Sequence, residues 1–142
     1  MNIFRRVLAA VDLSQEKGST RVLAAACETL EPGDTLHIIT VVPDYGMSIV
    51  GSFFPADHEG KMVAKAQDAL HDFTEKHLPA GISKQHIVAH GNVYEEILAA
   101  ADTVKADLIV VGTHPASARD YVLGPNAERI TRQAKCSVLA VR

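Results

Sequence analysis

Apolar runs with the character of β-strands alternate along this chain of 142 residues with stretches whose apolar side chains recur at helical spacing. The runs rich in Val, Ile and Leu predict strands at residues 4–11, 36–42, 85–90, 107–111 and 137–141. The stretches with helical spacing predict helices at residues 16–30, 59–78 and 125–135, and one that starts at Asn92, a natural cap. Five strands that alternate with helices indicate an α/β fold with a parallel sheet covered by helices on both faces.

The segment from Asp107 to Ile130 is the most informative part of the chain. It begins with an unbroken apolar run that ends at Val111, as expected of a parallel strand covered on both faces. Gly112 follows at once, where the backbone either turns sharply or lets a ligand come close. Gly124 precedes the next predicted helix, whose free N–H groups and positive dipole end can hold an anion. A strand, a glycine loop and a helix N-terminus in this order indicate phosphate binding.

A second group of candidate residues follows the first two predicted strands. Ligands of open parallel sheets bind beyond the carboxyl ends of the strands, where the strand order reverses. Asp12 follows the first strand, and it either accepts hydrogen bonds from a ribose or an adenine amino group or, like Ser14, caps the helix that follows. Val41 and Val42 end the second strand and are either an apolar wall for a flat base or ordinary core residues. If the first and fourth strands are neighbours, Asp12 and Gly112 converge on one crevice.

The loop between the two glycines offers further polar groups. Thr113 carries a hydroxyl, and His114 can donate to a phosphate, more strongly when it is protonated. Arg119 either reaches the phosphates from this loop or is a solvated surface residue, and the same choice applies to His114. Asn126 and the N–H groups near it complete the predicted anion seat.

Length, composition and charge favour a single domain and argue against some classes of partner. The length fits a single domain, residues 1–142. A net charge of −3 without a basic stripe argues against a nucleic-acid partner. No apolar run approaches the length of a membrane helix, and the N-terminus lacks the pattern of a signal peptide, so we expect a cytoplasmic protein without a membrane partner. The two cysteines, Cys27 and Cys136, are expected to be buried small apolar residues rather than a disulfide.

Several catalytic patterns are missing from the sequence. It has neither the phosphate-binding pattern GxxxxGK followed by Ser or Thr nor the dinucleotide pattern GxGxxG. No interpretable Ser-His-Asp set, carboxylate pair or zinc-ligand spacing is present. We therefore assign no strong catalysis and no metal site.

Motifs spread over the whole chain resemble those of universal stress proteins of the small single-domain type. They are VLAAVDLS, ITVVP, HGNVYEEIL and DLIVVGTHP…LGPNAERI…AKCSVLAVR. The resemblance implies a sheet of order 3-2-1-4-5, contacts of Asp12 and Val41 with adenosine, and phosphates that lie along Gly112 and Gly124. The residue pattern and the resemblance together give a set of predicted nucleotide-binding residues: Ala10, Asp12, Val41, Val111, Gly112, Thr113, His114, Arg119, Gly124, Pro125 and Asn126.

The chain departs from the family's nucleotide-binding pattern at three points. The second glycine of the pattern is Pro115, the distance from Gly112 to Gly124 is one residue shorter, and Pro125 replaces the Ser or Thr after the last glycine. Proline has no N–H, so two phosphate donors are lost, although Pro125 suits the first turn of a helix. Asn126 can substitute with its side-chain amide and its backbone N–H. A subset of the family shares a histidine in this loop and the Gly-x-Asn at its end.

The resemblance favours a stress-response protein that binds ATP, or another adenine nucleotide, with Mg²⁺ accompanying a triphosphate. Its enzymatic activity is at most weak ATP hydrolysis or autophosphorylation. The short apolar strand at residues 137–141 is either an unguarded edge that pairs with another chain or an edge covered by the chain's own helices. The family commonly dimerises through this strand, so a homodimer is expected. A nucleotide-independent dimeric adaptor is the main alternative, and an adenine-nucleotide hydrolase is a third. The apolar loop at residues 43–58 is expected to cover the adenine, join an interface or dock a partner.

Overall fold

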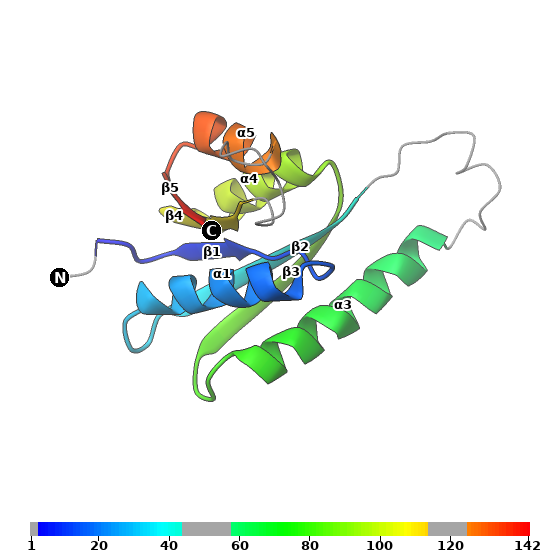
Figure 1. Cartoon of the computed structure of the whole chain (residues 1–142), viewed down its shortest axis with the longest axis horizontal. Helices are drawn as coiled ribbons and strands as arrows, with labels where there is room; N and C mark the ends of the chain where they lie inside the picture. Colours follow the sequence, from blue (N-terminus) through cyan, green and yellow to red (C-terminus); the bar gives the residue numbers. More distant parts are fainter. Residues whose placement is uncertain (1–2, 44–57, 114–124) are drawn as a thin grey trace.

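The computed structural model describes residues 3–43, 58–113 and 125–142 of the chain. Its centre is a five-stranded sheet of order β3-β2-β1-β4-β5 in which every neighbouring pair is parallel (Figure 1). The strands are β1 (Val7–Ala10), β2 (Thr35–Pro43), β3 (Ser83–Gly91), β4 (Leu108–Gly112) and β5 (Ser137–Val141). The predicted α/β fold and strand order are confirmed.

Helices cover both faces of the sheet. They are α1 (Glu16–Glu28), α3 (His58–His77), α4 (Val93–Val104) and α5 (Pro125–Gln133). Figure 1 shows α1 and α3 on one face and α4 and α5 on the other. Each face has its own apolar cluster: Val22, Leu23 and Leu70 belong to the first, and Ile97 and Ile130 to the second. Because β1 and β4 are buried on both faces, the sequence of each reads as a continuous apolar run.

The first strand begins later than predicted, because the backbone N–H groups just before it donate to a carboxylate and not to a neighbouring strand. The N–H groups of Arg5 and Arg6 donate to the side chain of Asp107 at 2.8–3.1 Å. The N–H of Asp107 in turn donates to the carbonyl of Arg6 at 2.9 Å. These bonds hold the segment before β1 against the residue that precedes β4, and regular pairing begins at Val7.

Three of the predicted helix starts are confirmed, including that of α1 at Glu16. The Asn92 side chain caps α4 by accepting from the N–H of Glu95 at 3.4 Å, and α5 begins at Pro125. The cap of α1 differs from the prediction. Gln15 occupies the cap position without a side-chain bond, so the alternative that Asp12 or Ser14 caps this helix is wrong.

Cys27 and Cys136 are free thiols in half-buried positions, and burial raises the pKa of each. None of the helices within the described ranges has both the length and the apolar character needed to cross a membrane. The expectations for the loop at residues 43–58 fall almost entirely on residues 44–57, which lie outside the described part of the chain.

Candidate functional site

The carboxyl ends of β1, β2 and β4 meet at a cavity of about 780 Å³. This volume lies within the range of pockets that hold small molecules, roughly 300–1,000 Å³. The described residues of its wall come from these three strands, from the loop after β1, and from all four helices of the described part. The cavity therefore includes the point where the order of this open parallel sheet reverses, between β1 and β4.

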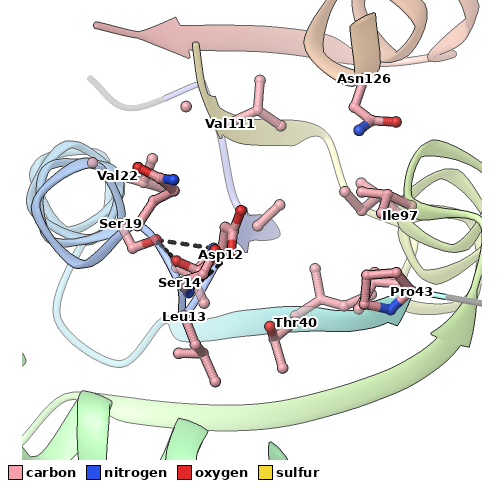
Figure 2. Close-up of a pocket in the computed structure, with 18 of the residues that line it drawn as sticks. Asp12, Leu13, Ser14, Ser19, Val22, Thr40, Pro43, Ile97, Val111 and Asn126 are labelled. Carbon is pink, nitrogen blue, oxygen red and sulfur yellow. Dashed lines mark hydrogen bonds between the residues drawn. The ribbon is translucent and has the colours of Figure 1, made fainter. Parts of the chain in front are cut away.

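The loop after β1 is fixed by Ser19, a residue of α1 with 3% of its surface exposed. The Asp12 N–H donates to Ser19 Oγ at 2.9 Å, and the Ser19 hydroxyl donates to the Asp12 carbonyl at 2.7 Å. The N–H and hydroxyl of Ser14 both donate to Asp12 Oδ1, at 2.9 and 2.6 Å (Figure 2). The exposed Asp12 carboxylate is thus held at the cavity wall by Ser14, and the backbone of Asp12 is held by Ser19.

The end of β2 contributes apolar and hydroxyl groups. Val41 is half-buried, packs against the second apolar cluster and also lines the cavity. Val42 is a core residue with 7% of its surface exposed, and it also lines the cavity. The two interpretations of these valines are therefore compatible, because one side chain can serve the core and the cavity together.

The end of β4 and the start of α5 close the opposite side. Val111, Gly112 and Thr113 line the cavity, and so does Asn126, the second residue of α5. The Thr113 N–H donates to the Val141 carbonyl at 2.9 Å, which continues the pairing of β4 with β5 past Gly112. Figure 2 shows Asn126 and Val111 on this side, apart from Asp12, Leu13 and Ser14. The glycine that ends β4 and the first turn of α5 therefore face one shared cavity.

Most of the predicted site residues that the structure describes meet in this wall. They are Ala10, Asp12, Val41, Val111, Gly112, Thr113 and Asn126. Pro125 begins α5 but is not among the described wall residues. His114, Arg119 and Gly124 lie outside the described residues, so their predicted phosphate contacts stay predictions.

Sequence reasoning missed one wall of the cavity, which α3 provides. The residues of α3 that line it are Met62, Lys65, Ala66 and Ala69. The sequence pattern predicts only that the apolar ones among them share one face of a helix. Leu13, Thr40 and Ile97 also line the cavity and carry no local signal for ligand binding. Helical spacing shows which side chains share a face, but it does not show whether a core or a cavity lies opposite.

The charges of the wall are few. Among the described residues that line the cavity, Asp12 and Lys65 are the only ones with charged side chains. Within the same described ranges, no three His, Cys, Asp or Glu side chains gather as a metal site would require. The cavity combines an apolar wall, a fixed carboxylate, several hydroxyl and amide groups, and one ammonium.

Comparisons with known proteins agree on one family. The model of the universal stress protein family matches residues 3–142. Universal stress protein A homolog 1 of Coxiella burnetii is 30% identical over 142 aligned residues, which cover 97% of this chain and 96% of that protein. A universal stress protein family member from Burkholderia pseudomallei has a similar solved structure, with a TM-score of 0.70, 23% identity, and coverage of 99% of this chain and 98% of that one. A universal stress protein solved in complex with cAMP has a TM-score of 0.61 and 23% identity, over 98% of this chain and 97% of that one.

Proposed function

This chain belongs to the universal stress protein family, and we propose that it is a cytoplasmic stress-response protein that binds ATP or another adenine nucleotide in the cavity at the carboxyl ends of β1, β2 and β4. One observation carries the proposal. Asp12, Val41, Gly112 and Asn126, which are far apart in the sequence, line the same cavity. Together they offer an acceptor, an apolar surface, a close backbone approach and an amide.

In the proposed complex each part of the nucleotide has a chemical counterpart. The flat base lies against Val41, and the Asp12 carboxylate accepts from the ribose hydroxyls or the adenine amino group. The phosphates lie along Gly112 and the first turn of α5, where Asn126 can donate and the positive end of the helix dipole favours an anion. A relative of the same fold was solved with cAMP, which also carries an adenine, a ribose and a phosphate.

The proposed role is signalling or protection through the bound state, not turnover. No nucleophile with a general base is evident in the described wall beyond the Ser14–Asp12 contact, whose partners are local in the chain. Any ATP hydrolysis or autophosphorylation is accordingly expected to be weak. Mg²⁺ would enter with the triphosphate, because it binds mainly to phosphate oxygens and keeps several waters.

Calorimetric titration of the purified protein with ATP, ADP, AMP and cAMP tests this proposal. We expect saturable heat with at least one of them and a matching rise in thermal stability, because a ligand that binds only the folded state stabilises it. Mass-spectrometric analysis of the denatured protein for a co-purified nucleotide provides an independent measurement. No heat, no stabilisation and no released nucleotide would rule out a nucleotide-binding function.

A nucleotide-independent dimeric adaptor is the second candidate, and one observation favours it. Pro125 is the first residue of α5, so the N–H that a Ser or Thr would offer at this position is missing. An adaptor would remain a dimer and would show no heat with any adenine nucleotide. The same titration, combined with light scattering, therefore separates the two functions.

A further inference from the structure

The face of α3 at the cavity has a composition that suits an anionic ligand. Met62, Lys65, Ala66 and Ala69 are spaced three and four residues apart, which places them on one side of the helix. The two alanines leave room beside the long side chain of Lys65. The helix is fixed against α1 at its other end, where Glu16 accepts hydrogen bonds from α3.

The side chain of Lys65 differs from that of Lys76 in its contacts. Lys76, later in the same helix, donates to Glu16 Oε1 at 3.1 Å. Within the described ranges, the side chain of Lys65 makes neither a hydrogen bond nor an ion pair. Its ammonium has three donors on a flexible stem of four carbons and can therefore turn toward a ligand in the cavity.

The Lys65 ammonium is the one positive charge among the described side chains of the wall. The other charged side chain among the described wall residues is Asp12, which repels an anionic ligand. A nucleotide brings additional negative charge with each phosphate, and Pro125 offers these phosphates no N–H. An anion would enter such a cavity at a cost unless a cation in the wall offsets its charge.

We infer that Lys65 is the cation that offsets the phosphate charge of the bound nucleotide, and that it makes the cavity prefer the more highly phosphorylated adenine nucleotides. This inference rests on the proposed nucleotide-binding function and assigns a specificity-determining role to α3. Affinity then rises from adenosine through AMP and ADP to ATP. A lysine that contacted only the base would not produce this order, because the base is the same in all four ligands.

The test compares Lys65→Gln with the unchanged protein in calorimetric titrations with adenosine, AMP, ADP and ATP. We expect the variant to lose about ten- to one-hundredfold in ATP affinity, the range for a hydrogen bond to a charged group, and to keep its adenosine affinity. Lys65→Arg should retain the order of the four ligands, since it retains the charge. Added salt should weaken ATP binding more in the unchanged protein than in Lys65→Gln.

Lys76→Gln is the matched control, because it removes the same charge from the same helix outside the cavity wall. It should bind all four ligands as the unchanged protein does. Equal ATP affinity in Lys65→Gln and the unchanged protein would overturn the inference and leave the proposed function standing, as would an equal loss for adenosine and ATP. If the unchanged protein bound none of the four, both the proposed function and this inference would fall.

Discussion

Gly112 lines the cavity, and its backbone does not need a glycine, because its φ lies outside the left-handed region that favours this residue. What Gly112 contributes to the wall is therefore the absence of a side chain. A Cβ built at this residue would lie 3.4 Å from Val22 Cγ2, an ordinary van der Waals contact. The described residues around Gly112 therefore leave room for an alanine. The requirement for glycine is then expected to come from the ligand, which approaches the backbone at the end of β4.

Gly112→Ala should accordingly separate stability from binding. We expect its free energy of unfolding to stay within about 1 kcal/mol of the original, and its ATP affinity to fall about tenfold, equivalent to about 1.4 kcal/mol of crowding at the ligand. Urea unfolding and calorimetry measure the two quantities. Gly60→Ala is the control, because a Cβ built at Gly60 in α3 meets no described atom within 4 Å and Gly60 is not among the residues that line the cavity. A destabilised Gly112→Ala with unchanged affinity would assign the glycine to the fold.

His86 illustrates how a single side chain makes stability depend on pH. Its Nε2 lies 2.7 Å from Thr74 Oγ1 on α3. Burial, together with the charges of His71 and Lys84, lowers its pKa below the ordinary value of 6.5. The unfolded chain therefore binds a proton at this residue more readily than the folded protein does. The free energy of unfolding therefore contains a contribution from His86 that is present above the ordinary pKa of histidine and is lost as the pH falls through the lowered pKa.

We expect the free energy of unfolding to decrease between about pH 7.5 and pH 5.5, and His86→Gln to reduce that decrease. Urea unfolding of both proteins at the two pH values gives the comparison. The difference between the two proteins isolates the contribution of His86 from that of every other side chain, because all the others are the same in both. Identical decreases in both proteins would show that His86 is not responsible.

At the scale of elements, Asp107 joins the segment before β1 to β4. Its carboxylate accepts three contacts from the N–H groups of Arg5 and Arg6. Asp107→Ala leaves those N–H groups without their acceptor, and we expect it to lower the free energy of unfolding by about 1.5–3 kcal/mol, as for hydrogen bonds to a charged group. Asp72→Ala, at an exposed position of α3, is the control and should change it by less than about 0.5 kcal/mol. A comparable loss in both variants would refute this role of Asp107.

The order and type of the elements could be predicted because the strands and helices of this chain differ clearly in pattern. The ends of β1 could not, because the bonds of Asp107 to Arg5 and Arg6 join residues about a hundred positions apart in the chain. The strand order came from the resemblance to a known family, since alternation alone fixes no neighbours. Local pattern thus predicts elements well and long-range hydrogen bonds poorly.

The candidate site was predictable where it follows a strand and unpredictable where it lies on a helix. Asp12, Val41 and Gly112 each lie within two residues of the carboxyl end of a strand, and the carboxyl ends of parallel strands meet at one edge of the sheet. Lys65 and Ala69 carry no such marker, because a lysine and an alanine are ordinary on a surface helix. On α3, Leu70 and Phe73 pack in the core while Met62 faces the cavity, although all three belong to one apolar stripe.

At the scale of the whole molecule, the sheet leaves β3 and β5 as its two edges. The residues of β3 include Lys84, Gln85 and His86, and charged or polar edges discourage pairing. On β5, Val138 and Ala140 pack against the second apolar cluster, while the Leu139 side chain is 38% exposed. An apolar edge of this kind is suited to pair with a second copy of the chain, and we propose that the expected homodimer forms through it.

Leu139→Lys tests the dimer because it places a charge on this edge without touching the cavity, to which the described part of β5 contributes no residue. We expect a monomer by light scattering, against a dimer for the unchanged protein and for the control Gln85→Lys on the β3 edge. The monomer should still bind ATP, since β5 contributes none of the described wall residues. A Leu139→Lys variant that remains a dimer would exclude the β5 interface. A monomer that has lost ATP binding would show that the second copy supports the cavity, and the nucleotide and the dimer would then be coupled rather than independent features.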